Sequence, residues 1–168
     1  MVQIQPHTWI ASDAALILGD VEFLTRTAES LAKKIRPLSV DAVLTAEAKS
    51  IALAYELSRR LGKSRFLVAR KSIKSYMGDY AAEKLKSITT PVEQELLLTK
   101  EEMRWLSGKR VCLLDDVVST GATFSALEGL VKKSGGKVAC KAAIWKEGPW
   151  YREKDLVYLR VLPIFVET

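Results

Sequence analysis

Two adjacent carboxylates end an apolar segment and lead directly into small and hydroxyl-bearing residues, in the stretch LLDDVVSTGAT at residues 113–123. Residues 109–116 have the length and composition of a buried strand, and residues 123–134 are predicted to form a helix that ends at Gly135. A strand that passes through a short turn into a helix is typical of α/β folds, in which ligands bind beyond the carboxyl ends of parallel strands. The pair Asp115 and Asp116 therefore predicts a ligand site at a strand end.

Strand-like and helix-like segments alternate along the rest of the chain. Helices are predicted over residues 20–36 and 47–63, and strands over residues 40–46, 65–71, 94–99, 137–145 and 156–166. Asp20 can cap the first helix, and Gly62 can end the second. The alternation favours an α/β fold in which a mostly parallel central sheet is flanked by helices on both faces. The 168 residues fit a single domain, residues 1–168, in which residues 72–91 form a long exposed connection.

The composition argues against several classes of functional site. The sequence has one histidine, which argues against Ser–His–Asp, Cys–His and multi-histidine metal sites. Its two cysteines, Cys112 and Cys140, lie in apolar segments and are expected to be packing residues in a reducing, cytoplasmic setting. No apolar run has the length of a membrane span, so we expect no membrane segment. The net charge of +6 suits an anionic small molecule, and it would also suit nucleic acid.

The chemistry of the turn favours a sugar phosphate. Carboxylates only accept hydrogen bonds, so Asp115 and Asp116 suit the hydroxyl pair of a ribose or a hydrated Mg²⁺. The turn that follows opens a helix, whose first N–H groups are unpaired and favour a bound phosphate. Acids for a diol beside donors for a monophosphate describe a receptor for ribose 5-phosphate. The alternative is an ordinary capped helix after a strand.

The same residues resemble those of a known family. The segment VCLLDDVVSTGAT, residues 111–123, resembles the phosphoribosyl pyrophosphate (PRPP) motif of the type I phosphoribosyltransferases. The segment at residues 43–62 resembles the pyrophosphate loop and following helix of the adenine and xanthine branch, and residues 66–74 resemble its next strand. The closing residues 162–167 resemble the adenine branch as well. The resemblance therefore covers most of the chain from about residue 20 onward.

The resemblance implies a role for each part of the site. Asp115 and Asp116 are the expected catalytic residues, which orient the sugar hydroxyls and hold Mg²⁺, the expected cofactor, through water. The expected 5′-phosphate site consists of Ser119, Thr120, Gly121, Ala122 and Thr123. The expected pyrophosphate site consists of Ala46, Glu47, Ala48, Lys49, Arg70, Lys71 and Lys74. The expected base site consists of Ile144, Trp145 and Lys146, with Trp9, Ile10 and Trp150 as further stacking candidates.

Two outlying segments complete this expectation. Residues 1–19 are too short for a large base-binding hood, so the hood must be small or partly built from the C-terminal end. Residues 72–93 are expected to form a mobile lid, from which Lys74, Tyr76, Lys84 and Lys86 could reach the anions. The adenine enzymes carry a Glu-Tyr-Gly step near the end of this lid, whereas this chain has TTPVEQ at residues 89–94. The altered step leaves catalysis by the lid open.

The leading hypothesis is a purine phosphoribosyltransferase, with adenine the favoured base. Its partners are PRPP and the base, and the family implies a homodimer. A second hypothesis is a non-catalytic PRPP-binding regulator that binds nucleic acid; the charge and the altered lid favour it, and the absence of an added DNA-binding segment opposes it. A pyrimidine transferase is a third, which the adenine-like flanking segments disfavour. Adenine, guanine and xanthine are not separated by the sequence.

Overall fold

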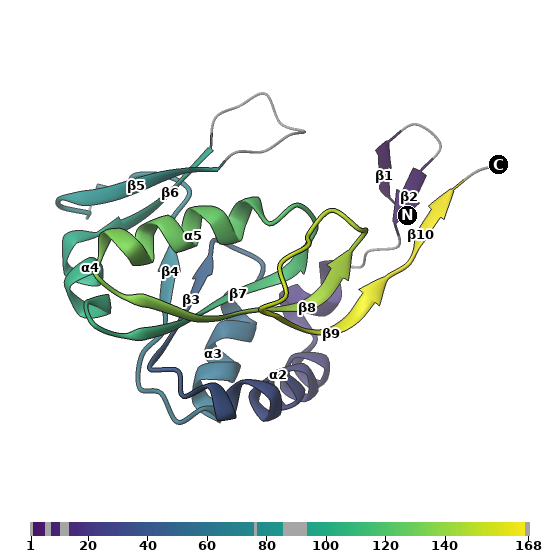
Figure 1. Cartoon of the computed structure of the whole chain (residues 1–168), viewed down its shortest axis with the longest axis horizontal. Helices are drawn as coiled ribbons and strands as arrows, with labels where there is room; N and C mark the ends of the chain where they lie inside the picture. Colours follow the sequence, from purple (N-terminus) through teal and green to yellow (C-terminus); the bar gives the residue numbers. More distant parts are fainter. Residues whose placement is uncertain (1, 6–7, 11–13, 76, 86–93, 167–168) are drawn as a thin grey trace.

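A five-stranded parallel sheet forms the centre of the molecule (Figure 1). The computed structural model of the protein describes residues 2–5, 8–10, 14–75, 77–85 and 94–166. The strands lie in the order β4 (Leu67–Ala69), β3 (Ala42–Ala46), β7 (Arg110–Val118), β8 (Lys137–Glu147) and β9 (Leu156–Leu162). Each neighbouring pair is parallel, so all five carboxyl ends meet at one edge. The α/β fold predicted from the sequence is confirmed.

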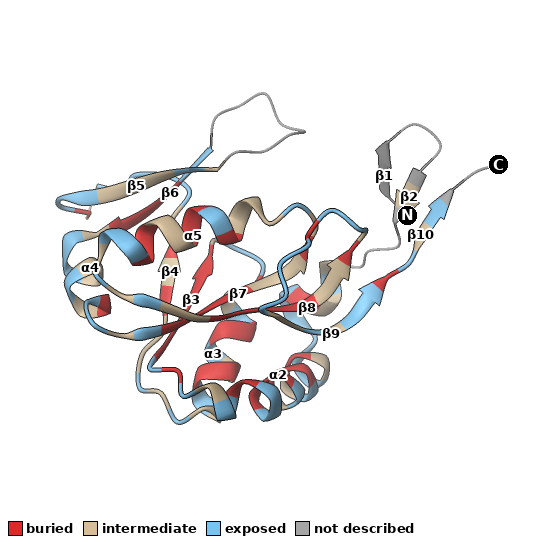
Figure 2. Ribbon diagram, viewed as in Figure 1, coloured by how far each residue is buried: buried red, intermediate tan, exposed pale blue. Residues whose placement is uncertain are grey.

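Helices cover both faces of the sheet (Figure 2). One face carries α1 (Ala14–Gly19), α2 (Val21–Ile35), which runs into the short 3-10 turn Arg36–Leu38, and α3 (Ile51–Arg60); α5 (Ala122–Lys133) and α4 (Lys100–Leu106) belong to the other side. In β7, Val111 and Leu113 join the core under α5, while Cys112 and Leu114 join the core under α2 and α3. Because successive strand side chains point to opposite faces, the buried part of this central strand, residues 111–114, must be apolar on both faces. Its burial explains why the sequence shows an uninterrupted apolar run.

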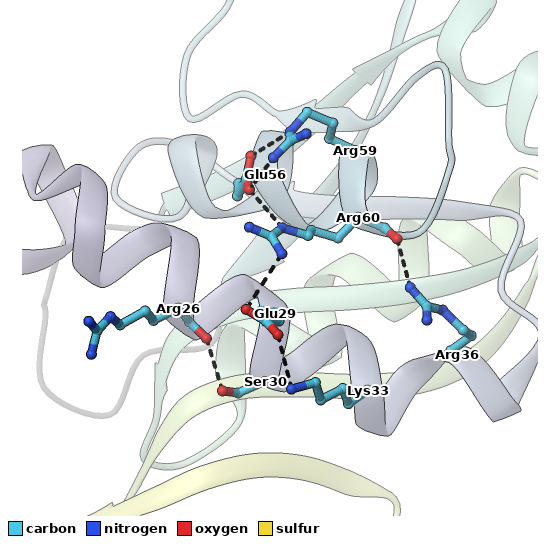
Figure 3. Close-up of polar contacts among 8 residues, drawn as sticks. All are labelled: Arg26, Glu29, Ser30, Lys33, Arg36, Glu56, Arg59 and Arg60. Carbon is cyan, nitrogen blue, oxygen red and sulfur yellow. Dashed lines mark hydrogen bonds and ion pairs between the residues drawn. The ribbon is translucent and has the colours of Figure 1, made fainter.

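A polar network crosslinks α2 and α3 (Figure 3). Glu56 accepts hydrogen bonds from the guanidinium groups of Arg59 at 2.7–2.8 Å and of Arg60 at 2.9 Å. Arg60 also lies 3.6 Å from Glu29 on α2, and the Arg36 guanidinium donates to the Arg60 carbonyl oxygen at 3.1 Å. These contacts hold α3 in place, and α3 follows the loop that closes one end of the site described below.

A separate antiparallel hairpin replaces part of the predicted exposed connection. Strand β5 (Tyr80–Leu85) pairs with β6 (Gln94–Thr99), and the pair packs against α5. The expectation of an irregular connection over residues 72–91 was therefore wrong for residues 80–85. The apolar side chains of β6, with Leu96 and Leu98 fully buried, need a covering partner, and β5 supplies it. Helix α4 was also missed; it begins immediately after β6 with a capping box formed by Thr99 and Glu102.

A small three-stranded sheet, called the hood below, joins the two ends of the described chain. It consists of β1 (Val2–Gln5), β2 (Thr8–Ile10) and β10 (Ile164–Val166) in the order β1–β2–β10. The predicted single strand at residues 156–166 is divided, because β9 belongs to the central sheet and β10 to the hood. Pro163 stands between them and lacks the N–H group that a continuous ladder requires. Figure 1 shows the hood beyond the carboxyl ends of β8 and β9. In the part of the chain described, no helix combines the length and apolarity needed to cross a bilayer.

Candidate active site

A cavity of about 420 Å³ opens along the carboxyl edge of the sheet. Its wall consists of Ala46, Glu47, Ala48, Lys49, Lys71, Leu85, Gln94, Asp115, Asp116, Val117, Ser119, Ala122, Thr123, Glu147 and Leu162. Residues at or just beyond the ends of all five central strands contribute, together with the two ends of the β5–β6 hairpin that face it. The cavity therefore occupies the position where parallel α/β sheets bind ligands.

Asp115 and Asp116 both line this cavity, although they are successive residues of β7. Oδ1 of Asp115 accepts a hydrogen bond from the backbone N–H of Asp116 at 2.9 Å and a longer one from the Ser50 hydroxyl at 3.5 Å. The Asp116 carboxylate lies 3.9 Å from Nζ of Lys49. The two acids thus differ in surroundings: one is fixed by neutral donors, and the other faces a cation.

The Asp115 carboxyl is a weak acid in this position. Burial, followed by the negative charge of Asp116, raises the pKa of Asp115 to about 8. Hydrogen bonds from the Asp116 backbone and the Thr123 hydroxyl act in the opposite direction and offset only part of this rise. The ligand-free site therefore retains a proton near neutral pH, and a bound cation or sugar hydroxyl group would favour the loss of that proton.

The turn after β7 forms a second, adjoining hollow of about 120 Å³. All five residues predicted to hold the 5′-phosphate line it: Ser119, Thr120, Gly121, Ala122 and Thr123. Gly121 has φ 85°, a left-handed conformation that glycine adopts readily, and it is the N-cap residue of the 12-residue helix α5. The unpaired first N–H groups of α5 and the hydroxyls of the turn can all donate to an anion here.

The loop between β8 and β9 returns to the start of α5. Tyr151, on this loop, is buried, and its ring meets Phe124 edge-on with centroids 6.1 Å apart. The Tyr151 hydroxyl donates to Glu153 at 2.9 Å, and Glu153 also forms an ion pair with the buried Lys141 of β8. From this loop Trp150 was a candidate on sequence grounds but Tyr151 was not; the Tyr151 ring packs against the start of α5 next to the turn at residues 119–123.

The loop from β3 to α3, residues 46–49, closes the other end of the cavity. The Thr45 hydroxyl donates to the Leu114 carbonyl oxygen at 2.8 Å and fixes the end of β3 against β7. The Glu47 carboxylate accepts a hydrogen bond from the backbone N–H of Lys71 at 2.9 Å, which joins the loop to the end of β4. The peptide between Glu47 and Ala48 is cis. The predicted helix start at residue 47 was too early, because α3 begins at Ile51 and residues 47–50 form the turn.

The four predicted cationic pyrophosphate residues are placed differently. Lys71 is exposed and lines the cavity. The Arg70 guanidinium folds back and donates to the Val68 carbonyl oxygen at 2.6 Å, and Arg70 is not part of the cavity wall. Lys74 is exposed and also lies outside the wall. Lys49 is on the wall, as Lys71 is, so two of the four predicted cations line the cavity.

The predicted base residues do not reach the cavity. Ile144 is buried in the core under α2 and α3. Trp145 stacks on Phe23 of α2, with ring centroids 5.8 Å apart and planes at 18°. Lys146 pairs with Val118 within the sheet and lies outside the wall. From the same strand, the cavity is reached by the last residue, Glu147, and Leu162 lies opposite it on β9.

The other base and lid candidates lie away from the cavity or outside the described residues. Trp9 is half-buried in β2 of the hood, and Trp150 is largely exposed in the β8–β9 loop. Lys84 is an exposed residue of β5. Residues 86–93, with Lys86, and Tyr76 lie outside the described residues, as does the side chain of Ile10. From the predicted lid, residues 72–93, Leu85 is the described residue on the wall. Gln94, the first residue of β6, follows the lid and also lies on the wall.

A model of the phosphoribosyl transferase domain family matches residues 20–166. The chain belongs to the phosphoribosyltransferase family. The adenine phosphoribosyltransferase of Cenarchaeum symbiosum is 30% identical over 132 residues, which are 79% of this chain and 74% of that protein. The adenine phosphoribosyltransferase of Thermosipho africanus is 31% identical over 129 residues, 77% of this chain and 72% of that protein.

A solved structure shares the fold of this phosphoribosyltransferase. The crystal structure of adenine phosphoribosyltransferase from Thermoanaerobacter pseudethanolicus has a TM-score of 0.71 with 22% sequence identity, and the match covers 84% of this chain and 82% of that one. The family match and the relatives, rather than this shared fold, make the protein a pentosyltransferase enzyme, as its motif predicted.

The carboxylates of Asp115 and Asp116 suit a magnesium ion that is held mainly by water and by the phosphates of a bound substrate. Among the described residues, no group of three or more His, Cys, Asp or Glu side chains could hold a metal ion by itself. Asp115 and Asp116 offer adjacent carboxylate oxygens on the cavity wall, which are ligands that Mg²⁺ prefers. Mg²⁺ is commonly bound by one or two carboxylates with water and substrate phosphates, so this donor set fits.

Proposed function

We propose that the protein transfers the 5-phosphoribosyl group of PRPP to adenine, giving a nucleoside 5′-monophosphate and pyrophosphate. One observation carries the proposal, namely the order of chemical groups along the sheet edge. Lysines and loop amides lie at β3 and β4, two carboxylates with an anion-binding turn lie at β7, and Glu147 and Leu162 lie at β8 and β9. Pyrophosphate, ribose 5-phosphate and base follow one another in the same order in the reacting substrates.

The sugar would be held at the centre of this edge. The turn at residues 119–123 binds the 5-phosphate through the first N–H groups of α5 and through hydroxyl groups. Asp115 and Asp116 accept hydrogen bonds from the ribose hydroxyls, which orients the anomeric carbon toward the open cavity. Fixing the sugar at both ends supplies much of the catalytic advantage, because a displacement between held reactants avoids most of its entropic cost.

The leaving group would be stabilised at β3 and β4. In the reaction, the bond from the anomeric carbon to the pyrophosphate oxygen breaks, a bond to a ring nitrogen of the base forms, and the proton of the base's ring N–H is released to solvent. Positive charge develops on the sugar and negative charge on the pyrophosphate. Lys49, Lys71 and the N–H groups of the loop at residues 46–49 lie where the negative charge grows. Mg²⁺ bound to the diphosphate, next to Asp115 and Asp116, would neutralise part of that charge.

The choice of adenine rests on the relatives and on the shape of the site. The two proteins compared above at 30% and 31% identity are adenine phosphoribosyltransferases. The hood, which neighbours the base end of the cavity, lies mostly before residue 20, where the family match begins.

A base panel tests the proposal. The purified protein is incubated with PRPP, Mg²⁺ and adenine, guanine, hypoxanthine, xanthine or orotate, and mononucleotide and pyrophosphate are both measured. We expect equimolar products with adenine as the best substrate. A variant with Asp115→Asn and Asp116→Asn is the control that should fold and remain inactive.

The same assay decides the alternatives. Turnover with orotate alone would replace adenine by a pyrimidine. No turnover with any base, together with RNA or DNA binding that weakens steeply as salt is raised, would favour the non-catalytic regulator. The net charge of +6 is the property of the chain that would favour binding to RNA or DNA. A homodimer in a cytoplasmic setting belongs to the same proposal and is tested by analytical ultracentrifugation and cell fractionation.

A further inference from the structure

Glu147 is a buried acid on the cavity wall that has no partner among the described residues. It is the last residue of β8, it is 8% exposed, and it lies on the cavity wall. Among the described residues, no hydrogen-bond donor or cation pairs with its carboxylate. The mechanism above gives it no role, since the sugar and both phosphate groups are already served by other residues.

Such a position is costly unless something fills the cavity. Glutamate is seldom buried without a partner, because a carboxylate removed from bulk water loses strong hydrogen bonds. Asp116, another carboxylate of the cavity wall, has Nζ of Lys49 at 3.9 Å. Glu147 has no equivalent, and the apolar side chain opposite it on β9 is Leu162. A bound group that donates hydrogen bonds would remove the cost.

The register of the sheet places Glu147 beyond the sugar. Asp115 pairs with Ala143 on β8, and Glu147 follows four residues later on the same strand. Four residues of extended strand span roughly 13 Å, which is comparable to the length of a ribose joined to a purine ring. Glu147 therefore lies at the height of a base whose sugar is held by Asp115, and it lies on the side of the sheet edge nearest the hood.

We propose that Glu147 accepts a hydrogen bond from the exocyclic amino group of the purine and thereby selects aminopurines. The proposal rests on the proposed function and refines it at the base. A carboxylate accepts hydrogen bonds and donates none, so it favours an amino group and opposes a carbonyl oxygen at the same position. Sites built to bind one polar group reject analogues without it more strongly than apolar pockets do, because the buried partner is then left unpaired.

The test combines a residue change with a change in the base. Wild type and Glu147→Gln are compared with adenine and with unsubstituted purine, which lacks the amino group. We expect Glu147→Gln to lower kcat/KM for adenine by about 10- to 100-fold, the value of a hydrogen bond to a charged group. For unsubstituted purine we expect a change of less than about 3-fold, because the lost partner was never engaged. The KM for PRPP should stay the same.

Guanine and hypoxanthine test whether Glu147 distinguishes the ring position of the amino group. Guanine carries an amino group at a different ring position, and hypoxanthine carries none. Glu147→Gln should lower the ratio of kcat/KM for adenine to kcat/KM for hypoxanthine. An equal loss of kcat/KM with guanine would show that Glu147 binds the amino group of either purine. Glu101→Gln, which changes an exposed glutamate on α4 outside the cavity wall, is the matched control and should alter neither ratio.

Two results would overturn the proposal. One is an equal loss for adenine and unsubstituted purine, and the other is a rise in the KM for PRPP alone, which would place Glu147 on the sugar or metal. Calorimetric binding of both bases in the presence of ribose 5-phosphate and pyrophosphate keeps the question separate from turnover. In one outcome no nucleotide forms, wild type binds adenine more tightly than unsubstituted purine, and Glu147→Gln binds the two bases equally. The proposed function then fails and the role of Glu147 stands. If wild type binds both equally, the role of Glu147 fails.

Discussion

The ring of Tyr151 lies directly against the backbone of Gly121. A Cβ atom added at Gly121 would lie 2.6 Å from both Cδ2 and Cε2 of that ring. The contact joins the β8–β9 loop to the turn at residues 119–123, and it requires a residue that has no side chain and tolerates φ 85°. The shape of the proposed phosphate site is therefore set partly by a loop more than twenty residues away in sequence.

Gly121→Ala should impair PRPP binding. The methyl group cannot occupy its place unless Tyr151 or the turn moves, and a displacement of about 1 Å in a substrate-positioning element can cost on the order of 100-fold in rate. We expect a rise in the KM for PRPP of at least about 10-fold, with a smaller change in the KM for the base. Steady-state kinetics with each substrate varied in turn provides the measurement.

Gly108→Ala is the matched control for that change. Gly108 also has a positive φ, 72°, but an added Cβ would meet no atom within 4 Å. It should carry the same backbone strain, about 1–2 kcal/mol, without altering the site. Equal effects of the two substitutions on the KM for PRPP would show that the contact with Tyr151 is irrelevant to binding.

Lys141→Met should destabilise the fold. The Lys141 side chain is 7% exposed, and its ammonium group contacts Glu153, Glu128 at 3.1 Å and Asp155 at 3.7 Å. Burial alone would lower the pKa of Lys141, but the hydrogen bonds to Glu153 and Glu128 outweigh it and raise the pKa. Removing the ammonium group leaves three carboxylates together, and we expect a loss of about 2–4 kcal/mol in the free energy of unfolding.

Urea denaturation measures the free energy of unfolding of Lys141→Met and Lys132→Met. The comparison separates the effect of losing a buried ammonium group from that of losing an exposed one. Lys132 pairs with the same Glu128 at 3.0 Å, but its side chain is 74% exposed. Its removal should cost no more than about 1 kcal/mol. A Lys141 variant as stable as the Lys132 variant would mean that the cluster does not anchor the loop.

The free energy of unfolding of Asp115→Asn should rise relative to that of wild type as the pH rises. The folded pKa of Asp115, about 8, lies above that of an unfolded aspartate, so between about pH 4 and pH 8 the folded state binds a proton that the unfolded state does not. Wild-type stability therefore falls with rising pH through this window, and the asparagine variant lacks that slope. Chemical denaturation at pH 5, 6, 7 and 8 measures it; a stability difference independent of pH would contradict the raised pKa.

Glu56→Gln should show the opposite dependence. Hydrogen bonding by Arg59 is the largest of the effects that lower the pKa of Glu56 to about 2, and Arg60 adds to it while burial opposes it (Figure 3). Its stabilisation is present above the unfolded pKa and is lost as the pH falls through the folded value. We expect Glu56→Gln to lose about 1–3 kcal/mol at pH 7 and to approach wild type near pH 2.

The exposed pair Glu22 and Arg26 on α2 serves as the comparison for Glu56. Its side chains are 74% and 78% exposed, although the contact is 2.7 Å. Glu22→Gln should cost less than about 1 kcal/mol at any pH. A similar cost for both glutamates would show that the α2–α3 network adds nothing beyond a surface ion pair.

The features that the sequence predicted well are contiguous ones. The buried strand, the acid pair and the turn at residues 119–123 follow one another without a break, and a strand-turn-helix unit fixes their relative positions locally. The same holds for Asp20, whose carboxylate accepts a hydrogen bond from the Phe23 N–H at 2.9 Å as an N-cap should. The order of these elements then required a parallel sheet.

The base end was not predictable in the same way, because it depends on register and on contacts between distant residues. Glu147 and Leu162 meet only because β8 and β9 pair in one particular register. Trp145 was a reasonable stacking candidate until its packing against Phe23 was known. Strand β5 has a weak pattern of its own, and its pairing with the apolar β6 makes it a strand.

A crystal structure of the protein with PRPP and Mg²⁺ tests the central claim most directly. It should place the 5-phosphate of the sugar against residues 119–123, the ribose hydroxyls within hydrogen-bonding distance of Asp115 and Asp116, and the pyrophosphate beside Lys49 and Lys71. A sugar phosphate bound anywhere other than this turn would contradict the account.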